Sequence, residues 1–253
     1  MGNKYKTVWI SDIHLGSYGC NARILCDFLK ELKKEGVQTL YLVGDIIDIW
    51  AMSRTGVKNW KPAHTKVIEL ILELARKGTS VHYIIGNHDE CFRGLIEKYA
   101  IIHAIDGVYV HNEATYRSVD GRDFLVIHGD QFDVVTRHHK WVARIGDWAY
   151  EKLLKMNRVV AYCREKCGLE YWSLSAYMKT KAKEAVKFIN DYEDNVARYA
   201  EMKGFDGVIC GHIHHPTIKE LRGITYMNDG DFVESCSALV EYPNGKFEIL
   251  YKK

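Results

Sequence analysis

Residues 81–90 read VHYIIGNHDE, a short apolar run that ends in a glycine, an amide, an imidazole and two carboxylates. Four further stretches join an apolar run to Asp or His in the same way: TVWISDIH (7–14), TLYLVGDIID (39–48), DFLVIHGD (123–130) and FDGVICGHIHH (205–215). Short apolar runs of this kind predict buried strands. Because sites in α/β sheets gather at the carboxyl ends of strands, the five stretches together predict one polar site at one sheet edge.

The segments between the first three runs have the spacing of amphipathic helices. Residues 21–36 and 62–78 carry apolar side chains at i, i+3 and i+4, and each segment ends in glycine. The alternation of strand and helix predicts the α/β class with a partly parallel sheet. Further strands are expected at 223–229, 237–242 and 246–252, and the Asn-Gly pair in YPNGKF predicts an antiparallel hairpin. The C-terminal part is therefore expected to be β-rich and antiparallel.

Residues 137–200 differ from the rest of the chain in composition. Helix formers dominate 138–167 and 173–204, and the segment holds 13 Lys and Arg against 8 Asp and Glu, whereas the remainder holds 22 against 25. We interpret residues 1–253 as a single domain into which 137–200 is inserted as a helical cap. The alternative interpretation is that this segment is simply more of the core.

Composition excludes several classes of protein. The chain has 253 residues, 47% hydrophobic and 27% charged content and a net charge of +2, which is ordinary for a globular protein and too small a charge to indicate nucleic-acid binding. No apolar run is long enough for a bilayer and no signal peptide is evident. Seven scattered cysteines without a CxxC pair favour reduced thiols and a cytoplasmic location.

The polar residues at the predicted strand ends share one ligand chemistry. Each motif alone is weak, since a lone Asp-x-His is more often a surface turn, but the five in order predict a metal centre. Carboxylate, imidazole and amide without thiolate suit Mn²⁺, Fe²⁺ or Zn²⁺. The set is too large for one ion and fits two divalent ions about 3.5–4 Å apart, an arrangement that serves hydrolysis of phosphate esters and anhydrides.

The ordered motifs D-x-H, G-D-x-x-D, G-N-H-D, H-G-D and G-H-x-H resemble those of the calcineurin-like metallophosphoesterase family, from Asp12 to His214. The resemblance implies a four-layer α-β-β-α sandwich and two metal ions, with Mn²⁺ the expected metal. One ion would be held by Asp12, His14, Asp45 and His214, and the second by Asp45, Asn87, His128 and His212.

The resemblance also implies roles for the neighbouring residues. His88 would contact the phosphate and protonate the leaving group. Asp48 and Asp89 would orient histidine ligands or His88, and Gly86 is expected to allow a tight turn. Asp133, Arg137, His138 and His215 are candidate substrate contacts. His64, His82, His103 and His111 lie within expected helices or strands and are expected to be structural.

One branch of the family is the most similar, the UDP-2,3-diacylglucosamine pyrophosphatases of lipid A synthesis. SDIHLG, YLVGDIIDIW, GHIHHP, GDFVESCSALVEY and a helical insertion after HGD resemble its pattern. The resemblance implies a sugar-nucleotide or lipid-linked substrate, a cap over acyl chains and peripheral contact with the cytoplasmic face of the inner membrane.

The chain departs from that branch at one residue. It carries Gly-Asn-His-Asp where the branch carries Gly-Asn-Arg-Asp. A histidine can act as a general acid near neutral pH and an arginine cannot. A nucleotide phosphodiesterase or phosphomonoesterase of the same family therefore stays an alternative, and a non-catalytic metal-binding scaffold is a second one.

Overall fold

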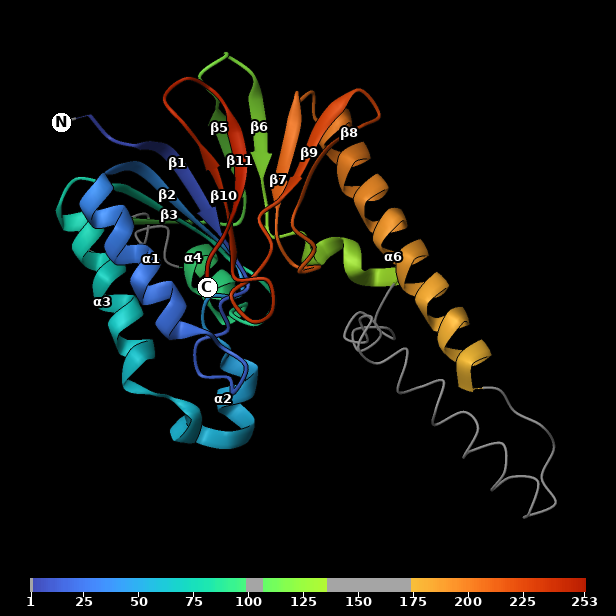
Figure 1. The fold of residues 1–253 in the computed structure, drawn as a ribbon, viewed down its shortest axis with the longest axis horizontal. Helices are drawn as coiled ribbons and strands as arrows, with labels where there is room; N and C mark the ends of the chain where they lie inside the picture. The colour runs from blue at the N-terminus through green and yellow to red at the C-terminus, as the bar shows by residue number, and fades with distance from the viewer. Residues whose placement is uncertain (1, 99–106, 136–173) are drawn as a thin grey trace. The chain divides into compact units, whose positions relative to one another are not determined.

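The computed structural model describes residues 2–98, 107–135 and 174–253 (Figure 1). The chain forms two compact units, residues 1–130 with 196–253, and residues 131–195. We call the first of these the sheet unit. It contains two β-sheets, and all five polar strand ends of the sequence belong to it.

The first sheet has six strands in the order β11-β10-β1-β2-β3-β4. The parallel pairs β1–β2, β2–β3 and β3–β4 confirm the predicted strand–helix alternation. The last two strands form the predicted antiparallel hairpin and join the sheet beside β1. The bounds are β1 (Tyr5–Ile10), β2 (Val37–Val43), β3 (Ser80–Ile84), β4 (Val108–His111), β10 (Ser237–Glu241) and β11 (Phe247–Tyr251).

The second sheet has five strands in the order β5-β6-β7-β9-β8. The bounds are β5 (Ala114–Arg117), β6 (Asp123–Val126), β7 (Gly207–Cys210), β8 (Thr217–Leu221) and β9 (Ile224–Asn228). The expectation of an antiparallel C-terminal region is wrong for β7 and β9, which are parallel. The reason is that β8 forms a hairpin with β9, and β9 returns between β8 and β7.

Two of the helices match the predicted segments within two residues at each end. These are α1 (Ala22–Glu35) and α3 (Pro62–Arg76). Three short elements were not predicted, because they are shorter than the window in which helical periodicity shows: α2 (Ile49–Thr55), η1 (Gly56–Asn59) and α4 (Cys91–Lys98). The remaining described helices are η2 (Asp130–Val135) and α6 (Leu174–Met202), and α6 matches the second helical stretch of the insertion.

Apolar side chains explain the layers of the sheet unit. On one face of the first sheet, Val8, Leu40 and Val81 pack with residues of α1 and α3, which cover that face (Figure 1). The opposite face packs on the second sheet through a separate cluster, whose members are Trp9, Tyr41, Val43, Ile84, Tyr116, Phe124, Val126, Ile209, Met227 and Leu239. The expected metallophosphoesterase architecture is confirmed in these helix and sheet layers.

The other global expectations concern membrane spans and cysteines. Within the described ranges, no helix has both the length and the apolar character that crossing a membrane requires. Five cysteines of the described chain are free thiols: Cys20, Cys26, Cys91, Cys210 and Cys236. Cys163 and Cys167, together with His103 and the whole first helical stretch of the insertion, lie outside the described residues.

A ladder of rings crosses the first sheet on the face toward the second sheet. Trp9, Tyr41, His82 and Tyr109 are register neighbours on β1 to β4. The rings stack with centroid separations of 5.8, 4.7 and 5.4 Å in that order. His82 also has polar partners, since its Nδ1 lies 3.1 Å from His111 Nε2 and its Nε2 lies 3.0 Å from Ser80 Oγ. The structural role expected of His82 is therefore that of a stacked ring within the sheet.

His82 makes folding stability depend on pH in a defined window. Burial, with the nearby His111, lowers the pKa of His82 from 6.5 to about 4. The unfolded chain then binds more protons than the folded one between these values. We expect the contribution of His82 to be complete above pH 6.5 and to be lost as the pH falls toward 4, and we expect the unfolding free energies of wild type and His82→Phe to converge over that window. A difference independent of pH would contradict this.

Candidate metal centre

Five strand ends deliver the polar residues to one site, as predicted. β1 is followed by Asp12 and His14, and β2 by Asp45. Backbone hydrogen bonds continue between these two loops beyond the strands, from Asp12 N to Gly44 O at 3.1 Å and from His14 N to Asp45 O at 2.9 Å. Parallel pairing of β1 and β2 therefore places the first two motifs side by side.

The backbone at the site is strained at five polar positions. Seven non-glycine residues of the described chain have positive φ, and five of them are residues of the predicted site: Asp12 (49°), His14 (52°), Asp45 (53°), His212 (71°) and His214 (54°). Each such residue costs on the order of 1–3 kcal/mol and persists only where the surroundings enforce it. Strain concentrated on these side chains indicates a functional site.

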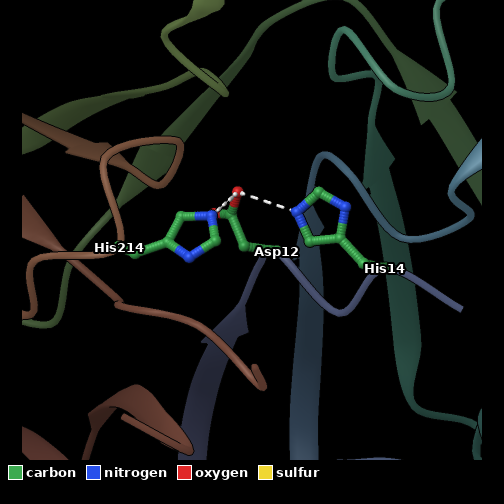
Figure 2. Close-up of side chains that lie close together, drawn as sticks. All are labelled: Asp12, His14 and His214. Carbon is green, nitrogen blue, oxygen red and sulfur yellow. Dashed lines mark ion pairs between the residues drawn. The ribbon is translucent and has the colours of Figure 1, made fainter. Parts of the chain in front are cut away.

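The first cluster of the site consists of Asp12, His14 and His214 (Figure 2). The two imidazoles lie on either side of the carboxylate, with Asp12 Oδ1 3.1 Å from His214 Nε2 and 3.8 Å from His14 Nε2. The ligand atoms of the three residues all lie within 4.8 Å of one another. This geometry can hold a metal ion.

The second cluster consists of Asp45, His128 and His212, again with ligand atoms within 4.8 Å of one another. His128 Nε2 lies 3.4 Å from Asp45 Oδ1, and its Nδ1 lies 2.8 Å from Val43 O. The backbone carbonyl therefore fixes the ring so that Nε2 faces the site. Asp45 Oδ2 lies 3.7 Å from His14 Nε2, so the two oxygens of Asp45 face the two clusters.

At two positions of the site only glycine fits, because a neighbouring side chain packs against the α-carbon. A Cβ on Gly86 would lie 2.3 Å from Asp45 Oδ1, and a Cβ on Gly44 would lie 2.3 Å from His128 Nδ1. Gly86 does not have positive φ, so its backbone conformation does not by itself require glycine. It is a glycine because the Asp45 carboxylate packs directly against its α-carbon.

Several polar atoms of the site are buried without making a hydrogen bond to any described residue. They include three atoms of candidate metal ligands, Asp12 Oδ1, Asn87 Oδ1 and His128 Nε2. A buried donor or acceptor without a hydrogen bond costs about 1–3 kcal/mol. A pair of divalent cations would satisfy all three atoms, and the carboxylate, imidazole and amide donors suit such ions. The residues present therefore fit the two-metal centre that the motifs predict.

Asp48 links two of the histidines and begins a helix. Its Oδ1 lies 2.9 Å from His88 Nδ1 and accepts from Ala51 N at 2.7 Å, and its Oδ2 lies 3.3 Å from His14 Nδ1. Burial raises the pKa of Asp48, but the hydrogen bonds of His14 and His88 outweigh it and hold the pKa well below its usual range. Asp48 is therefore ionised and placed to orient both rings.

His88 lies at the edge of the two clusters. Its Nε2 is 3.8 Å from Asp45 Oδ2, and its backbone N–H donates to Asp45 Oδ1 at 2.8 Å. The half-exposed Trp50 packs on the ring with a centroid separation of 4.4 Å. The Nε2 atom of His88 consequently points toward the shared carboxylate while Nδ1 is held by Asp48.

Asp89 has partners other than the expected imidazoles. Its carboxylate accepts hydrogen bonds from Gly86 N at 2.6 Å, from Ile46 N at 2.9 Å and from the hydroxyl of Tyr83. Asp89 therefore holds the loops after β2 and β3 together, through backbone N–H groups and a tyrosine hydroxyl rather than through the ring of His88. Its support of His88 acts through the backbone of these loops.

The candidate substrate contacts fall mostly beyond the described part of the chain. Asp133 belongs to η2 by its backbone, but its side chain, like Arg137 and His138, lies outside the described residues. His215 is exposed in the loop after His214. All four therefore stay candidate substrate contacts.

Residues that no motif indicated also build the site. Arg93 of α4 donates to both oxygens of Asp130 at 2.9 Å and to Ile85 O at 3.1 Å, which joins the loops after β3 and β6. Ser11 and Asp229 lie behind Asp12. Trp50 is the second residue of α2 and stands within GDIIDIW, but a lone tryptophan carries no signal of its own.

Backbone strain at His214 is testable in chelator-treated protein. Glycine adopts φ near 54° without cost whereas alanine does not, so we expect His214→Gly to be more stable than His214→Ala by about 1 kcal/mol. Urea unfolding measures the difference. Arg222, with φ 55° in the turn between β8 and β9, supplies a matched pair of variants outside the site. Equal stabilities of the glycine and alanine variants would show that the backbone there is unstrained.

Known proteins resemble this chain in sequence and in fold. A UDP-2,3-diacylglucosamine hydrolase of Cellvibrio japonicus is 27% identical over 216 residues, which cover 83% of this chain and 82% of that protein. One of Stenotrophomonas maltophilia is 26% identical over 245 residues, which cover 92% and 93%. A solved dimetal phosphatase from Danio rerio has a similar fold at 13% identity, covering 99% of this chain and 96% of that chain with a TM-score of 0.51.

The family comparison spans the same part of the chain as the site. The model of the calcineurin-like phosphoesterases matches residues 5–216, which run from the start of β1 to the loop that carries His214. The match therefore contains both clusters, His88 and the two sheets up to β7. The chain belongs to the calcineurin-like phosphoesterase family.

Proposed function

We propose that this metal-dependent phosphohydrolase cleaves the phosphoanhydride of a sugar-nucleotide substrate of the UDP-2,3-diacylglucosamine type. The observation that carries the proposal is that the two oxygens of Asp45 face the two ligand clusters, 3.4 Å from His128 Nε2 and 3.7 Å from His14 Nε2, with His88 Nε2 3.8 Å from the same carboxylate. Two relatives over most of the chain bear the name UDP-2,3-diacylglucosamine hydrolase, which supports the substrate class.

The metal ligands follow from the two clusters. Asp12, His14, Asp45 and His214 hold one ion, and Asp45, Asn87, His128 and His212 hold the other. Mn²⁺ is the proposed metal because hard carboxylate and amide oxygens accompany imidazole nitrogens in each set. Bound there, two divalent ions lower the pKa of a water toward ~7 and offset charge on the phosphate.

The remaining residues orient groups and move a proton. Asp48 accepts from His88 Nδ1, which fixes the ring and aims its Nε2 at the site. His88 donates a proton from Nε2 to the oxygen of the leaving group. Trp50 packs on the His88 ring and excludes water from one side of it. Asp89 holds the loops that carry Asp45 and His88 at a fixed spacing.

His88 itself favours a second candidate function. A nucleotide monophosphate is a weakly basic leaving group and needs little protonation, whereas an alkoxide needs a proton. A histidine that is held by a carboxylate beside the ligand clusters can supply the proton that an alkoxide leaving group needs. The second candidate is therefore phosphodiester or phosphomonoester hydrolysis at the same centre.

The inserted segment is proposed to act as the cap over the substrate. Residues 131–195 form a compact unit of their own, and 137–200 carries an excess of Lys and Arg over Asp and Glu of 13 to 8. A basic segment with many aromatic residues suits an anionic lipid-linked substrate and peripheral contact with the cytoplasmic face of a membrane. The protein is proposed to work in the cytoplasm.

A substrate panel tests the proposal directly. Mn²⁺-loaded protein is assayed with UDP-2,3-diacylglucosamine, bis-p-nitrophenyl phosphate and p-nitrophenyl phosphate. Turnover of the sugar nucleotide well above that of both aryl phosphates is the expected result. Turnover confined to the aryl phosphates would favour the second candidate. Bound metal without turnover of any of the three would favour a scaffold role.

Removal of the shared carboxylate should empty both metal positions. We expect Asp45→Ala to bind no Mn²⁺ at concentrations that load wild type, because both ions lose a ligand. Asp48→Ala is the matched control, because it removes a carboxylate that orients histidine side chains but is not itself a proposed metal ligand. It should weaken the Mn²⁺ affinity by about 10–100-fold and leave the number of ions bound at saturation unchanged. Metal analysis after dialysis measures both, and one retained equivalent in Asp45→Ala would refute the bridging role.

Replacement of His88 should separate chemistry from metal binding. We expect His88→Ala to keep both metals and to lose about 10²–10⁴-fold in turnover of alkyl phosphate esters, because the leaving alkoxide no longer receives a proton. Aryl phosphates, whose leaving groups need less protonation, should lose far less. An equal loss of turnover for alkyl and aryl phosphates would contradict the role of His88 as a general acid. Metal loss in proportion to the loss of activity would contradict it as well.

A further inference from the structure

The hydroxyl of Ser11 lies between two buried carboxylates. Ser11 is the residue after β1 and directly precedes Asp12. Its Oγ is 2.6 Å from Asp12 Oδ2, 2.7 Å from Asp229 Oδ1 and 3.0 Å from Gly230 O. Ser11, Asp12 and Asp229 are all fully buried. The contact therefore connects Asp12 to a second carboxyl group that lies in the loop after β9.

The number of hydrogens around Ser11 decides which groups donate. A serine hydroxyl has one proton, yet three oxygen atoms lie within 3.0 Å of it. The backbone oxygen of Gly230 can only accept. Asp12 Oδ2 also accepts from His212 N at 2.8 Å, as a carboxylate does. Asp229 Oδ1 is the one remaining position for a second proton, and a proton there donates to Ser11.

The surroundings of Asp229 also favour the neutral acid. Its second oxygen, Oδ2, is buried and makes no hydrogen bond within the described part of the chain. A buried carboxylate whose negative charge is neither paired nor hydrogen-bonded is expensive, whereas a buried carbonyl oxygen costs much less. The negative charge of Asp12 opposes a further negative charge on Asp229, whereas the hydrogen bond with Ser11 and the nearby His128 favour it, and burial outweighs both. Burial, followed by Asp12, raises the pKa of Asp229 well above its usual range.

We propose that Asp229 is a neutral carboxylic acid that donates through Ser11 to Asp12 Oδ2, and thereby directs Asp12 Oδ1 into the metal centre. Asp12 Oδ2 then receives two hydrogen bonds, from the Ser11 hydroxyl and from His212 N–H. Asp12 Oδ1 receives none and faces His14 and His214. Asp229 is a positioning residue for the ligand Asp12, and this inference rests on the proposed two-metal function.

The close approach of Gly211 is consistent with a fixed Ser11 hydroxyl. A Cβ on Gly211 would lie 2.3 Å from Ser11 Oγ and 2.7 Å from Asp12 Oδ2. The hydroxyl and the carboxylate are therefore packed against the backbone that leads to His212. Within this packing the Asp12 carboxylate has one orientation, and the hydrogen bond from Ser11 determines which oxygen is left for the metal.

Infrared spectroscopy tests the protonation state of Asp229 directly. The carbonyl stretch of a protonated carboxylic acid is separate from the bands of carboxylates and amides. We expect the difference spectrum between wild type and Asp229→Asn at pH 7 to contain this band, both in chelator-treated and in Mn²⁺-loaded protein. A difference spectrum that shows the loss of a carboxylate instead would overturn the proposal.

Metal affinity tests the positioning role independently of activity. Asp229→Asn keeps a donor toward Ser11 and the same neutral charge, so its Mn²⁺ affinity should stay within about threefold of wild type. Asp229→Leu and Ser11→Ala remove the donor chain and should weaken the affinity by about 10–100-fold. Equal weakening in Asp229→Asn and Asp229→Leu would indicate a lost negative charge and would contradict the neutral acid.

A control in the same buried cluster separates positioning from general damage. Ser237 Oγ donates to Asp229 O at 2.8 Å, so Ser237→Ala removes a buried hydroxyl that is not in the chain to Asp12. We expect it to leave metal affinity near that of wild type, and equal losses in Ser237→Ala and Ser11→Ala would contradict the proposal. Thermal unfolding of the chelator-treated variants reports whether each is folded.

Failure of the proposed two-metal function can be distinguished from failure of the proposal that Asp229 is neutral. If wild type binds no divalent metal, the two-metal function falls, while the infrared band of chelator-treated protein still decides whether Asp229 is neutral. If Asp229→Leu does not fold, the infrared result and the affinities of Asp229→Asn and Ser11→Ala still decide the proposal.

Discussion

The carboxylate of Asp45 is the interaction on which the rest of the site depends. One oxygen lies 3.4 Å from His128 and accepts the backbone N–H of His88, and the other lies 3.7 Å from His14 and 3.8 Å from His88. Both ligand clusters and His88 are therefore placed relative to this one side chain. Its pKa is held well below the usual range, because attraction to His128 outweighs the effect of burial. A buried charge of this kind is stable only among cations or protonated imidazoles.

The fold provides that carboxylate with a rigid setting. Asp45 follows β2, in the middle of the parallel part of the first sheet, and the loop after β1 hydrogen-bonds to its backbone. Gly86 lets the loop after β3 approach within contact of Asp45 Oδ1, and Asp89 ties that loop to Ile46. The left-handed backbone at five site residues is held by these neighbours. The strain at the site is thus offset by the packing of the two sheets below it.

Much of this arrangement could be predicted from sequence, because strand ends and polar motifs coincide. The buried runs identified eight of the eleven strands of the described chain, and the residues that follow four of them form the two ligand clusters, with His88 after a fifth. The short edge strands β4, β5 and β8 were missed, since four or five half-exposed residues carry little apolar pattern. The parallel pairing of β7 with β9 depends on where a hairpin returns, and local patterns do not encode that.

The missed parts of the site have a common cause. Arg93 and Asp229 act through contacts between residues far apart in the chain, and Ser11, although it stands beside Asp12 in the first motif, reaches Asp229 only in the folded structure. Asp89 stands in a motif, but its partners are backbone N–H groups and a tyrosine that only the folded loops bring to it. Spacing along the chain can indicate metal ligands, whereas the hydrogen bonds that orient them require the tertiary structure.

The most direct measurement of the central claim is a crystal structure of the Mn²⁺-loaded protein with anomalous scattering. Two peaks are predicted, one beside each oxygen of Asp45 and about 3.5–4 Å apart, the first in contact with Asp12 Oδ1 and the second with Asn87 Oδ1. A single peak, or two peaks of which neither contacts Asp45, would contradict the shared carboxylate as the basis of the site.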